Sequence, residues 1–375
     1  MKKLFLLFLL IPVFVFAEPM YSPTWGFFID LPEGYEFADG DGRDRFSFEG
    51  PGEFRFDMVV YNGRFNSLQD LTNDVNRRLS NRGDVDFFIY NGKQAAIMRL
   101  EFGDFEGWGL VVELDSQPNT PNVRPMLLAL AYGPEGMELY EIFHLSALDS
   151  IAPTFAERRY PGPITEYSFP RGNARNTPLA IRGLNAMIRE NDAEAAQVLI
   201  EREFAIYSEY LNTPFVYDAA ARYYRFIFRD SYDRISDAVM VITQHFGGHA
   251  AFTDEQKRVF AQRVLTFIQG FEYERDLSGS DFNNLVTAIT EGRGDCDPRS
   301  VLYALILNKV NIPSGIMLSY HYSHAMGLMD ITGIGTRIQF FDQWWMVAET
   351  TIFLDVGQIT EDMSDYRHWF PVFFD

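Results

Sequence analysis

The chain has 375 residues, of which 47% are hydrophobic and 16% aromatic, a composition typical of a globular protein with two or three domains. Its formal net charge at pH 7 is −20. A field of this sign repels phosphate backbones and anionic membrane surfaces, so the composition argues against nucleic acid as a partner.

The first 17 residues predict a secretory signal. Lys2 and Lys3 form its basic start, residues 4–16 its apolar run, and Val15-Phe16-Ala17 a small-residue cleavage site. This run is shorter than the roughly 20 apolar residues of a membrane-spanning helix, and no later apolar segment is long enough. We therefore expect an exported protein, periplasmic or extracellular, with no stable membrane insertion after signal cleavage.

Residues 20–153 predict an α+β domain. Ser67 is a typical N-cap for a helix that continues to Leu79, and Asn91-Gly92 is typical of a tight turn between two strands. A second helix is expected near residues 139–151. This element order, with a closing helix that ends in Ala-Leu-Asp-Ser-Ile, resembles the PsbP/Mog1-like α/β sandwich. The strands are expected at Trp25–Asp30, Phe54–Tyr61, Asp86–Tyr90, Ala95–Phe102, Trp108–Leu114 and Met126–Tyr132.

A turn is predicted at Asp39–Asp44, within this domain. The alternating Asp and Gly residues there hint at a calcium loop. Gly50 stands where such a loop needs its twelfth-position Glu, so the turn is favoured over a metal site.

The middle of the chain predicts a linker followed by helices. Residues 154–176 show no clear period and are expected to connect two domains. Thr177 and Pro178 are typical of a helix start, so residues 177–250 are interpreted as a helical segment. Its helices are expected at Leu179–Arg189, Asp192–Tyr210, Phe215–Phe228 and Ile235–Phe246.

Residues 251–375 predict a second α+β domain. Thr253 and Gln256 form a capping box for a helix that runs to about residue 271. A further helix is expected at Asp297–Val310, and two paired strands at His324–Ile331 and Arg337–Thr350.

Cys296 is the only cysteine of the chain, and it directly precedes the helix expected at Asp297–Val310. Exported proteins commonly use cysteines in disulfide-bonded pairs. A lone cysteine is therefore either an inert core residue or a residue whose thiol takes part in chemistry. The helix start favours a thiolate, whereas Asp295 and Asp297 raise the thiol pKa if their carboxylates face the sulfur. The sequence leaves this balance open.

A cysteine nucleophile needs a base and a group that orients the base. His324 opens one of the two C-terminal strands and is preferred to His321 as the base. Glu349 ends the second strand and is the favoured orienting acid. A hairpin centred near residues 333–335 would place Glu349 opposite about residue 320, so contact with His324 needs a shift of register. Asp342 and Asp330 are the alternative acids.

Four sequence blocks in this order resemble the bacterial transglutaminase-like (papain-like cysteine hydrolase) superfamily over residues 253–352. They are Tyr273-Glu274-Arg275-Asp276, Gly292-Arg293-Gly294-Asp295-Cys296, Ser323-His324-Ala325 and Trp345-Met346-Val347-Ala348-Glu349-Thr350-Thr351.

The resemblance implies a papain-like α+β fold with Cys296 as nucleophile, His324 as base and Glu349 as orienting acid, where the family usually has Asp. It also implies acyl transfer at an amide of a protein or peptide substrate through a Cys thioester, without a metal or organic cofactor. Peptidase or amidase action is favoured over cross-linking. The alternative is a catalytically inactive member that serves as a binding or scaffold module.

Overall fold

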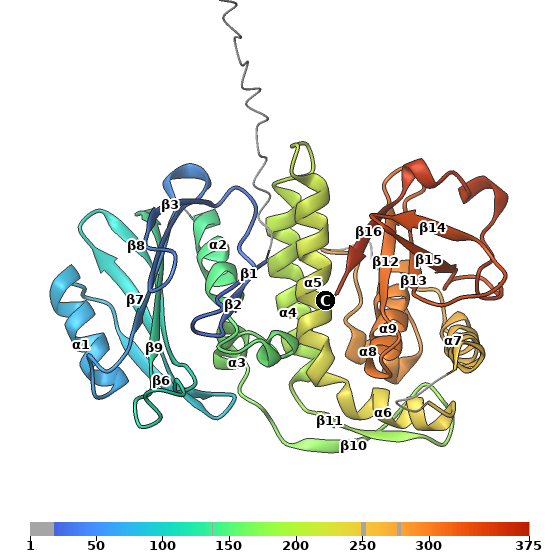
Figure 1. The fold of residues 1–375 in the computed structure, drawn as a ribbon, viewed down its shortest axis with the longest axis horizontal. Coiled ribbons are helices and arrows are strands. Elements are labelled where there is room, and N and C mark those ends of the chain that lie inside the picture. Colours follow the sequence, from blue (N-terminus) through green and yellow to red (C-terminus); the bar gives the residue numbers. More distant parts are fainter. Residues whose placement is uncertain (1–18, 137, 249–252, 276–278, 375) are drawn as a thin grey trace, which may run out of the picture.

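The computed structural model of the chain describes residues 19–136, 138–248, 253–275 and 279–374. Within these residues the fold is α+β, with an antiparallel sheet at each end and two long helices between the sheets (Figure 1). The predicted signal, residues 1–17, lies outside the described residues. Among the described helices, none is both long and apolar enough to cross a membrane.

The N-terminal sheet has seven described strands in the order β3-β4-β5-β9-β8-β7-β6, each antiparallel to its neighbour. A separate small pair, β1 and β2, precedes it. The bounds are β1 Met20–Tyr21, β2 Phe28–Ile29, β3 Glu36–Gly40, β4 Arg45–Glu49, β5 Arg55–Tyr61, β6 Val85–Tyr90, β7 Lys93–Phe102, β8 Phe105–Glu113 and β9 Met126–Pro134, with a 3-10 turn at Pro51–Glu53.

Helices cover both faces of this sheet. Strand alternation turns Ala96 and Met98 of β7 toward α1 (Leu68–Leu79), and Ala95 and Ile97 toward the opposite core. That second core includes α2 (Glu138–Asp149) and α3 (Pro163–Ser168). The predicted cap of α1 is confirmed, because Ser67 Oγ accepts the Asp70 backbone N–H at 3.1 Å.

Two local predictions in this region are confirmed and one is wrong in extent. Asn91-Gly92 forms the β6–β7 turn, with both residues at positive φ. The turn predicted at Asp39–Asp44 is confirmed over residues 41–44, where Asp41 accepts three backbone N–H groups, whereas Asp39 and Gly40 end β3. Of the strand predicted at Trp25–Asp30, only the two residues of β2 pair with β1. Strands β3 and β4 were not expected.

The helix predicted at Leu179–Arg189 is wrong, because these residues belong to a β-hairpin. Strand β10 (Ala174–Pro178) pairs with β11 (Asn185–Arg189). Burial alternates along β11, which is a strand period, and Gly183 takes a left-handed φ of 84° in the connecting turn. The predicted linker also contains regular structure, namely α3 and a 3-10 turn at Ala156–Arg159.

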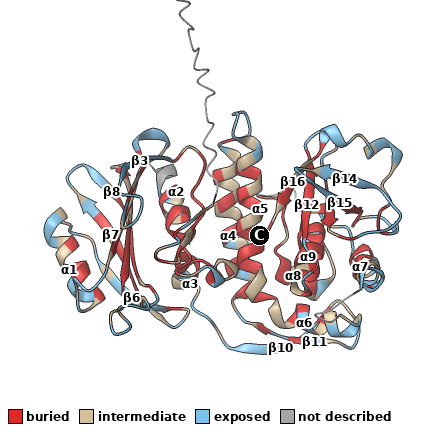
Figure 2. Ribbon diagram, viewed as in Figure 1, coloured by how far each residue is buried: buried red, intermediate tan, exposed pale blue. Residues whose placement is uncertain are grey.

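Helices begin beyond this hairpin. They are α4 (Asp192–Ser208), α5 (Val216–Arg234) and α6 (Ser236–His245). The first two form the central pair that stands between the sheets in Figure 1, and much of their length is buried in Figure 2.

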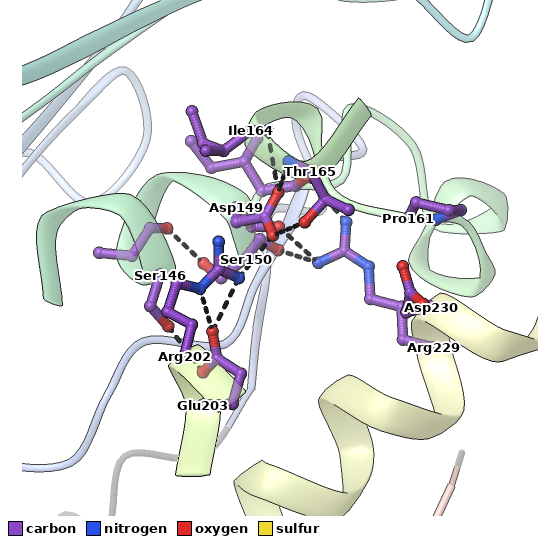
Figure 3. A network of polar contacts seen from close by, with 12 residues as sticks. Ser146, Asp149, Ser150, Pro161, Ile164, Thr165, Arg202, Glu203, Arg229 and Asp230 are labelled. Carbon is purple, nitrogen blue, oxygen red and sulfur yellow. Dashed lines mark hydrogen bonds and ion pairs between the residues drawn. The ribbon is translucent and has the colours of Figure 1, made fainter. Parts of the chain in front are cut away.

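A buried polar network joins the N-terminal unit to the central helices (Figure 3). Asp149, at the end of α2, accepts hydrogen bonds from the Thr165 hydroxyl at 2.5 Å and from Arg202 of α4 at 2.6 Å. Arg229 of α5 donates to the carbonyl oxygens of residues 149, 150, 151 and 160 at 2.7–3.0 Å. Arg222 of α5 bonds Glu203 at 2.7 Å. These bonds satisfy buried charges that would otherwise oppose folding.

The C-terminal sheet has the strand order β14-β15-β13-β12-β16. One face packs against α9, and the other holds a separate apolar cluster that includes Met326, Leu328 and Trp345. The bounds are α7 Asp254–Gln269, α8 Leu285–Glu291, α9 Cys296–Lys309, β12 Ser314–Ser319, β13 His324–Met329, β14 Arg337–Phe340, β15 Gln343–Ala348 and β16 Phe370–Phe373, with 3-10 turns at Glu361–Met363 and Tyr366–His368.

The strand predicted over Arg337–Thr350 is wrong as a single element. It folds back at Phe341-Asp342 into the β14–β15 hairpin, with Phe341 at a φ of 54°. Strand β15 then lies between β13 and β14. No Gly or Asn-Gly pair marks this turn, so its position was not expected.

Candidate active site

Cys296 is the first residue of α9. Asp295 is the N-cap, and its Oδ1 accepts the Asp297 backbone N–H at 3.2 Å. The cysteine is 7% exposed and lines a cavity of about 330 Å³. The thiol therefore lies at a helix N-terminus, as predicted, and the fold places it at the wall of a cleft.

The charges around the thiol oppose its ionisation. Burial raises the pKa of Cys296, and the Asp297 and Asp295 carboxylates raise it further. The thiol donates a hydrogen bond to Asp297 Oδ1 at 3.4 Å, and Asp297 Oδ2 accepts the Tyr224 hydroxyl at 2.7 Å. The Asp297 carboxylate therefore faces the sulfur, and burial and both carboxylates raise the thiol pKa.

His324 and Glu349 form a buried pair. The distance between His324 Nε2 and Glu349 Oε2 is 2.8 Å. The second carboxylate oxygen accepts the Thr351 backbone N–H at 2.8 Å and its hydroxyl at 2.6 Å. Burial raises the pKa of Glu349, but the bonds from His324 and Thr351 outweigh it, so the pKa is lowered overall. The imidazole therefore has an ionised, fixed partner at Nε2, which leaves Nδ1 for another contact.

Strand register explains how this pair meets. Strands β13 and β15 pair Gly327 with Ala348. Continuing the register by one residue places Glu349 opposite Met326, two residues from His324 on the same face. The contact is therefore diagonal, and a glutamate side chain spans it. The predicted position opposite residue 320 was wrong, because β14 was included in the strand that pairs with β13.

The alternative residues lie elsewhere. His321 is exposed and stacks on His368, with ring centroids 4.1 Å apart. Asp330 follows the far end of β13, and Asp342 is exposed in the β14–β15 turn. The structure thus brings together the preferred histidine and the preferred acid.

The cleft brings Cys296 and His324 to one cavity lining. Among the described residues, however, the thiol hydrogen bond goes to Asp297 and not to the imidazole. A thiol, an imidazole with an ionised partner, and a helix N-terminus that supplies free N–H groups can together perform acyl transfer.

Sequence reasoning missed the opposite wall of the cleft. Tyr207 of α4 and Tyr223 and Tyr224 of α5 line it, together with Tyr320. The Tyr207 and Tyr320 hydroxyl oxygens are 3.0 Å apart and join the central helices to the C-terminal domain. No local motif marks these residues, because their role depends on how two distant segments pack. Tyr273 also lines the cleft, and Trp345 belongs to the apolar cluster on the other face of the C-terminal sheet.

No group of three or more His, Cys, Asp or Glu side chains within the described ranges is arranged to hold a metal ion.

Comparisons with known proteins place the chain in no family. No family model matches it, and no curated protein matches it. A solved structure of a protein from Bacteroides thetaiotaomicron is 10% identical to this chain, and the match covers 85% of this chain and 88% of that protein, with a TM-score of 0.21.

Proposed function

We propose that the protein is a cysteine hydrolase of transglutaminase-like type that cleaves an amide of a protein or peptide. The observation that carries this proposal is the His324–Glu349 contact at the rim of the cleft that Cys296 lines. The two residues are 25 positions apart and come from different strands, yet they make the histidine–acid contact that a thiol nucleophile needs.

In the proposed reaction, His324 takes the thiol proton as Cys296 Sγ bonds to the amide carbonyl carbon. The C–N bond breaks, and the amine leaves with the proton from the imidazole. Water then attacks the thioester carbon and gives a proton to His324. The C–S bond breaks, the carboxylic acid is released, and the sulfur takes the proton back from the imidazole, which restores the thiol. Glu349 holds the imidazole and stabilises its cation. The Cys296 backbone N–H, at the first position of α9, is one donor for the oxyanion.

The test is digestion of a peptide library, with new termini identified by mass spectrometry. We expect Cys296→Ala to abolish cleavage and His324→Ala to slow it by at least about 100-fold. His321→Ala is the matched control, because this exposed histidine lies outside the cleft lining, and it should retain the wild-type rate. Equal products from the wild type and Cys296→Ala would contradict the proposal.

A second candidate is a non-catalytic binding module with the same cleft. The contact that favours it is the bond from the thiol to Asp297, in a setting that raises the thiol pKa. Under this candidate, an acyl-peptide substrate gives no covalent adduct on Cys296, whereas the hydrolase accumulates a thioester detectable by intact mass.

We also propose that the protein is exported and that its first domain is of PsbP/Mog1-like type. The signal-like residues 1–17 support secretion to the periplasm or beyond. The seven-stranded sheet with helices on both faces supports, at the level of element order, the likeness to PsbP/Mog1-like sandwiches. We propose that this domain holds the central helices against the catalytic domain.

A further inference from the structure

The cleft at Cys296 has two walls that belong to different parts of the fold. One wall comes from the central helices and includes Tyr207 of α4 and Tyr223 of α5. The other comes from the C-terminal domain and includes Leu318 and Tyr320. A cleft between two packed units changes width when the units move relative to each other. Contacts that cross it from wall to wall therefore determine whether a substrate can enter.

Tyr320 makes such a contact. It is the first residue of the short loop between β12 and β13, and its hydroxyl lies 3.0 Å from the Tyr207 hydroxyl and donates to the Val216 carbonyl oxygen at 3.3 Å. Its ring packs against Tyr217 of α5 and Phe370 of β16, with centroids 5.6 and 5.4 Å apart. We refer to Tyr320 with its hydroxyl contacts to Tyr207 and Val216 as the Tyr320 strap.

The strap lies on the solvent side of the cleft, and the thiol lies on its floor. Tyr320 is 44% exposed, whereas Cys296 is 7% and Tyr223 4% exposed. The thiol and the strap line the same cavity of about 330 Å³. This volume is at the small end of the range for ligand sites, which suits one side chain but not a length of peptide chain. A peptide that reaches the thiol therefore needs a wider opening than the strap leaves.

The contacts of the strap are of a kind that can open. A single hydrogen bond changes an equilibrium only severalfold, because water replaces the lost partner, and the two tyrosine hydroxyls meet at an exposed site. The loop that carries Tyr320 is held separately at its next two residues. The His321 ring stacks on His368 with centroids 4.1 Å apart, and Tyr322 meets the same histidine edge-on at 5.6 Å. The Tyr320 side chain can therefore swing away while the loop and His324 stay in place.

We propose that the Tyr320 strap is a gate: it closes the cleft between the central helices and the C-terminal domain, and a protein or peptide chain reaches Cys296 only after Tyr320 has left Tyr207 and Val216. The proposal rests on the proposed hydrolase function for the identity of the incoming chain as substrate. The gate itself concerns access to the thiol, so it is measurable on protein that turns nothing over.

The test compares two reagents of the same chemistry and different size, iodoacetamide and the bulky iodoacetamidofluorescein. Both label Cys296, the only thiol of the chain, and intact mass gives each rate. The ratio of the bulky to the small rate cancels the intrinsic reactivity of the thiol, and the ratio in urea-unfolded protein gives the value for free access. We expect the ratio in folded wild type to be at least about tenfold lower, because the bulky reagent reaches the thiol only from the open state.

Conservative variants locate the gate without removing a ring. Tyr320→Phe removes the hydroxyl contacts and should raise the ratio about threefold or more. Tyr207→Phe removes one of the same contacts and should raise it too, and the double variant should match Tyr320→Phe alone because the two hydroxyls share one bond. Tyr322→Phe is the matched control. It removes a hydroxyl from the same loop, but Tyr322 is not among the described residues that line the cleft, so the ratio should stay at the wild-type value.

An unchanged ratio in Tyr320→Phe would overturn the gate, and so would a folded wild-type ratio equal to the unfolded one. Independent, multiplying effects of the Tyr207 and Tyr320 substitutions would also overturn it, because the two hydroxyls would then act separately. If the wild type cleaves peptides but the ratio does not respond to Tyr320→Phe, only the gate fails. If the ratio responds but no peptide is cleaved, only the hydrolase proposal fails.

Discussion

Cys296 rests in a setting that keeps it protonated. Asp297 accepts the thiol hydrogen at 3.4 Å, and burial with two adjacent carboxylates raises the thiol pKa. The helix N-terminus acts in the opposite direction. In the proposed reaction, a thiol of this kind would lose its proton to His324 during the chemical step, rather than react as a preformed thiolate.

Replacing Asp297 should make the thiol more reactive. Asp297→Asn removes a negative charge beside the sulfur while leaving an oxygen that accepts the Tyr224 hydroxyl, so the pKa of Cys296 should fall. We expect alkylation by iodoacetamide at pH 7 to be about tenfold faster or more. The rate is followed by intact mass, with Asp342→Asn as the control. An unchanged rate–pH profile would show that Asp297 does not control the thiol.

Glu349 should contribute acid-sensitive stability. Its folded-state pKa is lowered by the contacts with His324 and Thr351, so its ionised form is favoured in the folded protein. The contribution is complete above the unfolded pKa of about 4.3 and is lost as pH falls through the lower folded pKa. Urea unfolding of the wild type and Glu349→Gln should therefore show a difference that is constant above about pH 5 and shrinks below it. A pH-independent difference would contradict this assignment.

At the scale of the element, α9 depends on its cap for both stability and site geometry. Asp295 Oδ1 accepts the Asp297 N–H, and Pro298 occupies a position where no intrahelical bond is lost. The cap therefore fixes the backbone on either side of Cys296.

Removing the cap should weaken the helix start. Asp295→Ala should lower the free energy of unfolding by about 0.5–2 kcal/mol, as for other N-cap losses. Asp295→Asn retains a capping oxygen and removes the repulsion with Asp297, so its stability should equal or exceed that of the wild type. Chemical denaturation measures both variants. An alanine variant as stable as the asparagine variant would contradict the capping role.

The pairing of β13 with β15 determines the His324–Glu349 contact, which the spacing of the two residues along the sequence does not. The register of Gly327 with Ala348 makes His324 and Glu349 diagonal neighbours. A side chain one methylene longer than Asp suits such a diagonal better than a directly opposed position, where Cβ atoms lie about 4.5–5.5 Å apart.

At the scale of the whole molecule, α4 and α5 contact the N-terminal unit on one side and the cleft at Cys296 on the other. One side bonds the N-terminal domain through Arg202, Arg222 and Arg229 (Figure 3). The other side supplies the tyrosine wall of the cleft. The C-terminal end of the chain adds to this junction, because Phe374 stacks on Phe228 of α5 with ring centroids 4.1 Å apart.

Breaking the buried polar contacts between α2 and the central helices should destabilise the protein. Asp149→Ala leaves Arg202 without one of its carboxylate partners and removes the acceptor for Thr165. We expect the free energy of unfolding to fall by about 3–5 kcal/mol. Asp365→Ala, which breaks an exposed pair with Arg367, should leave the free energy of unfolding almost unchanged. Similar midpoints of denaturation for the two variants would contradict the role of the buried network.

The sequence by itself determined the α+β class, five of the seven described strands of the N-terminal sheet, β13 of the C-terminal sheet, the caps of α1 and α7, and the residues worth testing as a site. These features depend on local periodicity and capping chemistry, which neighbouring residues encode. Local patterns failed at Leu179–Arg189 and Arg337–Thr350, where strand pairing overrode helix-start residues in the first case and an unmarked turn split the strand in the second.

Only the tertiary structure decided which groups surround the thiol. The direction of the Asp297 carboxylate, the diagonal approach of Glu349 to His324 and the tyrosine wall from α4 and α5 all depend on segments far apart in the chain. Electrostatic effects on a buried group depend on distances through space and on burial, which residue spacing does not contain.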